Sequence, residues 1–308
     1  MIKDLIRDGW GYHDTESQRL ADELEAVDLS ALEGEEPAHC LRLANHTIGE
    51  HLGDWARARR FAEAVHTRTA DDSHDGRFGA HLAVARHMAG DVVAAQQAEI
   101  DALRVADDPI DVYLTAKSSL AGALAGTGRF TDAGRLIAAA NRLASGLGES
   151  ATSDRSMAIT NNNLASELVE SEELGADQIR LMLDCATAAH TFWKRCGTWV
   201  NEERALYLLA LVHNRAGHHR AGLRHAQTAL DVIAANGEEP VDEAFIRLAV
   251  ANAHIGLSDA ESAAEHLARA DELVSAWSDE SLVAWYQRDR ARVSSALRGE
   301  TEKTRGAG

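Results

Sequence analysis

Histidine is the residue type in this sequence with the most chemical potential, because fifteen are present and imidazole is a common metal ligand. His46 and Glu50 stand four residues apart, on one face of a helix, and form the one candidate ligand pair. The same spacing also suits an ordinary surface hydrogen bond. The sequence contains no HExxH motif and no two histidines four residues apart. We therefore expect no cofactor, and no metal unless His46 and Glu50 contribute to a site.

The three cysteines are Cys40, Cys185 and Cys196, and none is part of a CxxC motif. In a continuous helix Cys185 and Cys196 would be about 16 Å apart, which is too far for one metal ion. An odd number of cysteines does not make a disulfide framework, so we expect reduced thiols in a cytoplasmic protein. The amino-terminal residues show no secretory apolar segment, and no run approaches the roughly 18 apolar residues of a membrane span.

Catalytic motifs are absent from the sequence. It has no GxSxG elbow, no GxxxxGK[ST] loop and no GxGxxG that follows a strand and opens a helix. Its 31 Lys and Arg against 49 Asp and Glu give a net charge of −18, which argues against a nucleic-acid or membrane-surface partner. The sequence therefore predicts a non-enzymatic protein. The oligomeric state is left open.

A repeated pattern indicates the elements that would position functional residues. Glycine turns recur between apolar segments, at intervals of 37 and 38 residues for the first three and 39 for the last two. Only three prolines and 5% aromatic residues favour long helices over a β-sandwich. The turns are GDW at 53–55, GDV at 90–92, GRF at 128–130, GHH at 217–219 and GLSD at 256–259.

Small residues recur at fixed distances from these turns. One lies in the helix before each turn and two lie in the helix after it. Two antiparallel helices approach to about 8–10 Å only where the side chains between them are small. The pattern therefore predicts helical hairpins. The sets are Ala83, Ala95 and Ala102; Ala121, Ala133 and Ala140; Ala210, Gly222 and Ala229; and Ala251, Ala263 and Ala270.

The pattern resembles the tetratricopeptide repeat family in a longer-period variant, with 37–45 residues per unit where the family has 34. The best match is the fifth unit, with Leu209, Ala210, His213, Gly217, Gly222, Ala226, Ala229 and Leu230. The resemblance implies an all-α fold, a right-handed α-α superhelix of about six helical hairpins with terminal cap helices.

The expected organisation has four parts. Residues 1–36 form an N-terminal cap segment with one helix from about Thr15 to Val27. Residues 37–278 form the repeats, and residues 279–298 form a C-terminal capping helix sealed by Trp277 and Trp285. Residues 299–308 are a disordered tail. The expected hairpins span residues 37–68, 77–108, 110–147, 156–195, 202–236 and 241–276.

In such an array the first helix of each hairpin lines the concave face. The distance from the small residues indicates which apolar and small side chains face this inner side. They are Ile159 and Ser166 in the fourth hairpin, Leu211 in the fifth, and Phe245 and Leu248 in the sixth. Asparagine offers a donor and an acceptor to a peptide backbone, and arginine can hold a carboxylate with two hydrogen bonds. The predicted partner-binding groove therefore consists of Asn162, Arg204, Tyr207, Asn214 and Asn252.

Three functions are compatible with these features. The resemblance favours a non-enzymatic scaffold that binds a peptide or partner protein in its concave groove. The first alternative is a ligand- or peptide-sensing regulatory protein that acts through a separate effector. The second alternative is a metal- or haem-linked protein, which rests on the histidine count alone.

Overall fold

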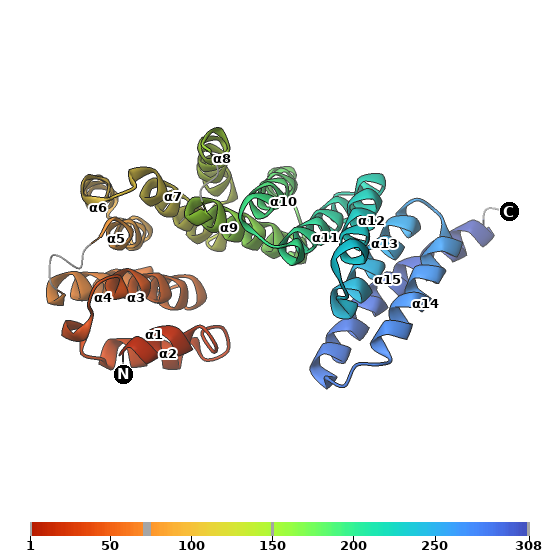
Figure 1. Cartoon of the computed structure of the whole chain (residues 1–308), viewed down its shortest axis with the longest axis horizontal. Helices are drawn as coiled ribbons and strands as arrows, with labels where there is room; N and C mark the ends of the chain where they lie inside the picture. The colour runs from red at the N-terminus through yellow and green to blue at the C-terminus, as the bar shows by residue number, and fades with distance from the viewer. Residues whose placement is uncertain (1, 70–74, 149–150, 307–308) are drawn as a thin grey trace. The chain divides into compact units, whose positions relative to one another are not determined.

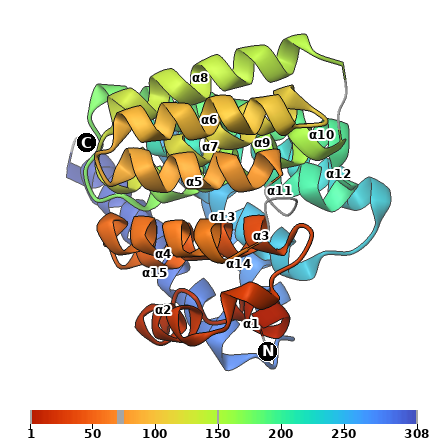
Figure 2. The ribbon, with the colours of Figure 1, turned by 90° about the vertical axis from the view of Figure 1, so that its left-hand side faces the viewer.

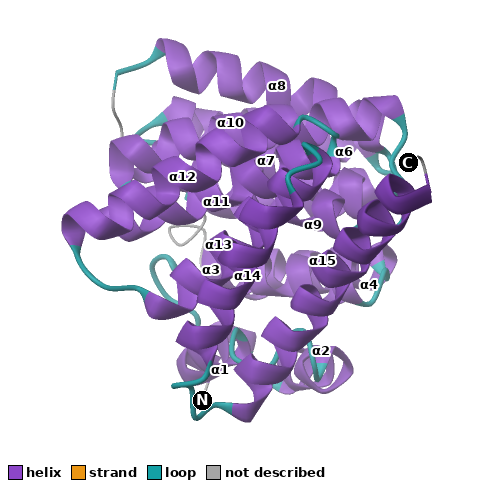
Figure 3. Cartoon of the chain, turned by 90° about the vertical axis from the view of Figure 1, so that its right-hand side faces the viewer, coloured by secondary structure: helices purple, strands orange, loops and turns teal. Residues whose placement is uncertain are grey.

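The protein is helical throughout the part of the chain that the structure describes. The computed structural model describes residues 2–69, 75–148 and 151–306, and these residues form helices and loops without any strand (Figure 3). This confirms the all-α fold class. Across these same ranges, none of the helices combines the length and the apolarity needed to cross a bilayer.

The chain divides into two compact units, an N-terminal unit of residues 1–148 and a C-terminal unit of residues 149–308. The sequence analysis treated residues 37–278 as one array and did not predict this division. The reason is that the repeat pattern continues in the sequence on both sides of the boundary.

The N-terminal unit consists of helices that pack in successive pairs (red to green in Figure 1). The pair α3 and α4 lies between the pair α1 and α2 and the helices α5 to α8 (Figure 2). The elements are α1 (Ile2–Gly9), α2 (Ser17–Ala26), the 3₁₀ turn η1 (Leu29–Ala31), α3 (Glu36–Ala44), the π-helix η2 (Asn45–His51), α4 (Trp55–Arg68), α5 (Gly76–Met88), α6 (Val92–Val105), α7 (Pro109–Gly126) and α8 (Phe130–Gly146).

The C-terminal unit repeats the same plan. The first helices of its hairpins, α9, α11 and α13, pack side by side. Helix α15 packs against α13, in the position that the first helix of a further hairpin would take (Figure 1). The elements are α9 (Ala151–Glu170), α10 (Ala176–Cys196), α11 (Trp199–Arg215), α12 (His219–Asn236), α13 (Pro240–Gly256), α14 (Ala260–Val274) and α15 (Glu280–Gly306).

The described residues contain six successive helical hairpins. In each hairpin the first helix packs against the second helix. The alanines predicted to lie between paired helices are all buried, at 5% exposure or less. A methyl group is small enough for two helix backbones to approach closely there. These hairpins confirm the helical-repeat fold implied by the tetratricopeptide resemblance. The hairpins are α3–η2 with α4, α5 with α6, α7 with α8, α9 with α10, α11 with α12, and α13 with α14.

The turns inside the hairpins follow one backbone rule. Gly53, Gly90, Gly128 and Gly217 have φ between 68° and 90°, a left-handed conformation that glycine adopts without a Cβ clash. In the last hairpin Ser258 takes this position with φ of 61°, and Gly256 is instead the final residue of α13. The predicted turn at 256–259 is present, but its left-handed residue is Ser258, two positions after Gly256.

Helix starts agree with the sequence in part. Pro37, Pro109 and Pro240 all lie in the first turn of a helix, where the missing N–H had no partner. The residue after the turn often caps the second helix. Asp54, for example, accepts a hydrogen bond from the Arg57 N–H at 2.8 Å, and Asp259 accepts one from the Ser262 N–H at 3.1 Å.

The N-terminal segment differs from the prediction of one helix. The structure has two, α1 and α2, packed on each other. An eight-residue helix gives little signal in a sequence because it is unstable in isolation and depends on packing. Here α1 is held by burial of Ile2 and Ile6, and Gly9 approaches the side chains of Leu20 and Leu43.

The C-terminal segment also differs. The prediction of a capping helix at residues 279–298 is correct in kind, but α15 continues to Gly306. The prediction of a disordered tail from residue 299 is wrong for residues 299–306, and residues 307–308 lie outside the described chain. Glutamate, lysine and arginine in this stretch are good helix formers, so a helix already held by packing can propagate through it.

Replacing Gly128 by alanine should lower the free energy of unfolding by about 1 kcal/mol, because alanine strongly disfavours a φ of 78°. Gly126→Ala is the matched control two residues earlier. It ends α7 without a left-handed φ, and an added Cβ would meet nothing within 4 Å at either position. Gly126→Ala should leave stability unchanged or slightly raised. Urea denaturation of both variants measures the difference, and equal destabilisation would contradict the turn assignment.

Candidate binding pocket

A pocket of about 410 Å³ lies in the C-terminal unit, where α9, α11, α13 and α15 come together. Its floor is apolar and its rim is polar, which is the usual composition of a protein binding site. The lining residues are Val169, Glu170, Ser171, Glu172, Tyr207, Leu211, Arg215, Phe245, Leu248, Ala249, Asn252, Asp289, Arg292 and Val293.

Helical spacing aligns these side chains. Tyr207, Leu211 and Arg215 are four residues apart on α11, so they project from one face as a stripe. Phe245, Leu248 and Asn252 make the corresponding stripe on α13. Because α11 and α13 pack directly on each other, the two stripes become neighbours and form one surface.

The floor of the pocket is fixed by aromatic packing. The ring of Phe245 lies 4.9 Å from that of Trp285 and 5.9 Å from that of Tyr286, measured between ring centroids. Tyr286 is buried, and its hydroxyl donates to Asp271 at 2.8 Å. The sequence analysis chose Trp277 and Trp285 as the seal on the last hairpin, but Trp285 is half exposed and Tyr286 is the buried seal.

The rim carries both charges. Arg215 Nη2 donates to the backbone oxygens of Ser171 and Glu172, at 2.7 and 2.8 Å, and so fixes the end of α9 against α11. Arg292 lies 3.5 Å from Glu170 in an exposed ion pair, a kind of contact that contributes little to stability. Burial raises the pKa of Tyr207, so its hydroxyl stays protonated at neutral pH.

The structure brings together part of the predicted groove. Tyr207 and Asn252 line the pocket, as do Leu211, Phe245 and Leu248. Asn162, half-buried on α9, and Arg204 are not among the lining residues. Arg204 is exposed on α11, and its Nε donates to Asp242 on α13 at 2.8 Å. Arg215, Glu170 and Arg292 were missed because they lie at helix ends or on the cap helix.

Asn214 has a structural role rather than an exposed place in a groove. Its side chain is buried, and Nδ2 donates to the Ala249 carbonyl oxygen at 2.9 Å, across the contact between α11 and α13. Gly222 provides the space, since a Cβ there would lie 2.3 Å from Asn214 Oδ1. Asn45 makes the same kind of bond to the His81 carbonyl oxygen in the N-terminal unit. The inner stripe of α11 therefore includes Arg215, one residue beyond the predicted Asn214.

The other candidate chemical groups lie outside this pocket. His46 and Glu50 are hydrogen-bonded to each other on η2 in the N-terminal unit. Cys40, Cys185 and Cys196 are free thiols. Burial raises the pKa of Cys40 and of Cys185 to about 12, so neither forms a reactive thiolate at neutral pH.

Comparison with known proteins gives distant structural similarity. No family model matches the sequence, and no curated protein matches it. One similar solved structure is a STAND signal-transduction ATPase with a tetratricopeptide repeat sensor from Pyrococcus horikoshii, at 14% identity and a TM-score of 0.46. Another is the APC/C Cut9–Hcn1 hetero-tetramer, at 12% identity and a TM-score of 0.34. The alignments cover 90% of this chain but only 42% and 47% of those chains. Similarity at this level says nothing about function.

A buried carboxyl group lies beside the Arg204–Asp242 pair. The side chain of Glu203 is fully buried on α11, and its nearest charged neighbours include Asp242 and Arg204. Burial raises the pKa of Glu203 well above its ordinary value of 4.5, and the Asp242 carboxylate raises it further. Burial therefore favours the protonated form of Glu203 in the folded protein. The sequence analysis did not single it out.

Glu203→Gln should stabilise the protein increasingly as the pH rises. Above the ordinary carboxyl pKa the unfolded chain loses a proton that the folded chain keeps, so stability falls by up to about 1.4 kcal/mol per pH unit from this group. Glutamine has no proton to lose and removes this dependence. Urea denaturation at pH 5 and pH 8 measures the effect, with the exposed Glu261→Gln as the control. A Glu203→Gln effect that is the same at both pH values would contradict the assignment.

Proposed function

We propose that this protein is a non-enzymatic interaction module, and that the pocket between α9, α11, α13 and α15 binds an extended peptide segment of a partner protein. The observation that carries the proposal is the convergence of Tyr207, Leu211, Phe245, Leu248 and Asn252 on one apolar surface. Such a floor accepts an apolar side chain as an anchor. The occupant is therefore a peptide with at least one bulky apolar residue.

The polar groups suit a peptide backbone on either side of that anchor. The Asn252 amide is half-buried in the pocket and carries both a donor and an acceptor, the pair of groups that a neighbouring peptide bond requires. Arg215 uses one guanidinium nitrogen, Nη2, to hold two backbone oxygens, and the guanidinium carries further N–H donors. The rim mixes Glu170 and Asp289 with Arg292, so the proposal does not require a strongly charged peptide.

The net charge and the free thiols support a protein partner and a cytoplasmic location for this function. The net charge of −18 opposes binding to nucleic acid or to an anionic membrane surface. Three free cysteines are typical of proteins in a reducing compartment, so the proposed module works in the cytoplasm.

The test is selection of peptides from a random library on the full-length protein, followed by fluorescence anisotropy with the selected peptides. We expect peptides that share a bulky apolar residue and bind with micromolar Kd. Leu211→Ala/Asn252→Ala should weaken binding at least 10-fold, because both side chains lie inside the pocket. Gln227→Ala/Thr228→Ala, on the exposed face of α12, should bind as the wild type does.

Two outcomes would count against peptide recognition. The first is peptides that bind the wild type and Leu211→Ala/Asn252→Ala equally well, which would remove the pocket from the interaction. The second is a metabolite that raises the Tm of the wild type but not of the pocket variant, in the absence of any selected peptide. That second result would favour the alternative of a ligand-sensing regulator.

A further inference from the structure

Three histidine rings converge in the N-terminal unit. His13 lies in the loop between α1 and α2, and His46 and His51 lie on the π-helix η2. One ring nitrogen from each of the three lies within 4.8 Å of the other two. The Nε2 atoms of His46 and His51 are 3.2 Å apart. The cluster is formed by residues that are 33 and 5 positions apart in the sequence, so no local motif reveals it.

The π-helix is the reason that His46 and His51 meet. In an α-helix, residues five apart are rotated by about 140° around the axis and face different ways. A π-helix has hydrogen bonds between residues five apart, as between Leu52 N and Thr47 O at 3.1 Å, and this aligns side chains at that spacing. Gly49 supports the distortion, since a Cβ there would lie 2.5 Å from the ring of Trp55. Single π-turns of this kind occur frequently at functional sites.

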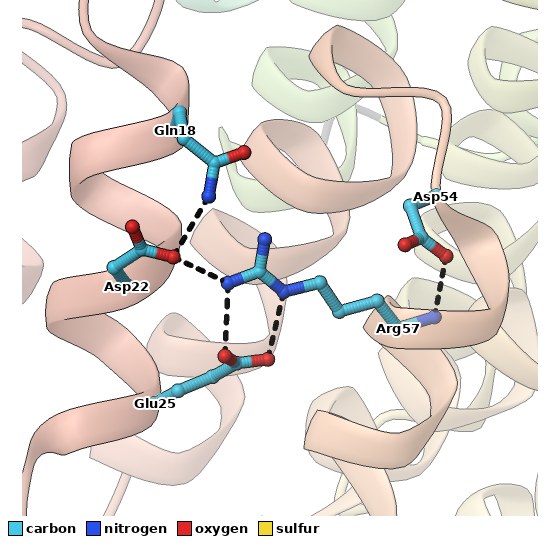
Figure 4. Close-up of polar contacts among 5 residues, drawn as sticks. All are labelled: Gln18, Asp22, Glu25, Asp54 and Arg57. Carbon is cyan, nitrogen blue, oxygen red and sulfur yellow. Dashed lines mark hydrogen bonds and ion pairs between the residues drawn. The ribbon is translucent and has the colours of Figure 1, made fainter.

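The third histidine is brought into place by the docking of α2 against η2 and α4. Arg57 on α4 holds α2 through a bidentate pair with Glu25, at 2.8 Å for both bonds, and through Asp22 at 2.7 Å (Figure 4). Gln18 adds a bond to the same Asp22 carboxylate (Figure 4). At the start of α2, Ser17 Oγ donates to the His13 carbonyl oxygen at 2.6 Å, which ties the histidine loop to the helix.

The Nδ1 atoms of His13 and His46 are hydrogen-bonded outside the cluster, and the Nε2 atoms of His46 and His51 are in hydrogen-bond contact with each other, a contact that a bound metal ion would replace. His13 Nδ1 lies 2.8 Å from the Trp10 carbonyl oxygen, which only accepts, so this nitrogen carries the proton. His46 Nδ1 bonds the Glu50 carboxylate in the same way. A histidine whose second nitrogen donates to a carbonyl or carboxylate is the usual arrangement at protein metal sites. Glu50, predicted as a ligand, thus orients His46 instead.

The spacing fits a small tetrahedral ion. With Zn–N bonds of about 2.0–2.1 Å, two nitrogen ligands of a tetrahedral site are about 3.3 Å apart. The observed 3.2 Å between the Nε2 atoms of His46 and His51 is close to this value.

We propose that His13, His46 and His51 bind a divalent late first-row transition metal ion, with Zn²⁺ as the best fit, through three Nε2 atoms. Glu50 is a positioning residue for His46. Three protein ligands leave the fourth position of a tetrahedral ion open to water or to an exogenous ligand, because His51 is at the surface. The ion would join the α1–α2 loop to η2. This site is independent of the peptide pocket in the C-terminal unit.

The test is isothermal titration of ZnCl₂ into the full-length protein after treatment with a chelator. We expect one equivalent of Zn²⁺ per chain with a Kd in the micromolar range or below. His51→Gln should weaken binding at least 100-fold, and its exposed position makes a folding defect unexpected. Glu50→Gln should keep the one-to-one stoichiometry and weaken binding about 10- to 100-fold. His39→Gln, an exposed histidine outside the cluster, is the matched control.

A second readout separates the site from general attraction of cations to an acidic protein. Co²⁺ in place of Zn²⁺ should give the intense visible absorption bands of a four-coordinate ion in the wild type, and these should be lost in His51→Gln. Far-UV circular dichroism checks that each variant is folded. Several weak equivalents of Zn²⁺ that are unaffected by His51→Gln, or equal binding by His51→Gln and His39→Gln, would overturn the proposal.

Discussion

Close contact between the two helices of each hairpin is the constraint on which the rest of the structure depends. In the four hairpins α5–α6, α7–α8, α11–α12 and α13–α14, alanine or glycine at three positions lets the backbones approach, and any larger side chain there would separate them. Once the contact faces are fixed, the remaining faces are fixed as well. The inner stripe of each first helix is the direct result, and in the C-terminal unit the inner stripes of α11 and α13 line the pocket.

The same constraint explains the positions of two buried asparagines. Asn214 and Asn45 each use one amide to link the first helices of successive hairpins, in two different units of the chain. Their carbonyl acceptors already belong to helices, so the amide adds a second bond without opening the backbone. Each asparagine therefore fixes the sliding position of one hairpin on the next, which apolar alanine contacts alone do not specify.

Features that repeat with a regular period could be predicted from the sequence. Features that depend on the local backbone conformation could not. Small residues and turn glycines repeat about every 38 residues, so the hairpins and the stripe with Tyr207, Leu211 and Phe245 could be predicted. An error of one residue turned Asn214 outward in the prediction, because one position rotates a side chain by about 100°. The predicted turn at 256–259 includes Ser258, but its left-handed backbone was not predicted, because a left-handed serine has no distinct signature in a sequence. The pairing of His46 with His51 was missed because helical spacing was assumed to be α throughout, and His13 was missed because it lies in a loop 33 residues before His46.

The π-helix at Asn45–His51 has a consequence for how such a protein can change. It accommodates one more residue per turn than its α-helical surroundings, so insertion or deletion of a single codon interconverts the two forms. The shift is absorbed locally, while the hairpin contacts on either side keep their alignment. Deletion of one residue between His46 and His51 would leave the two histidines four positions apart, on one face of an ordinary α-helix, so the pair is compatible with either form of the segment.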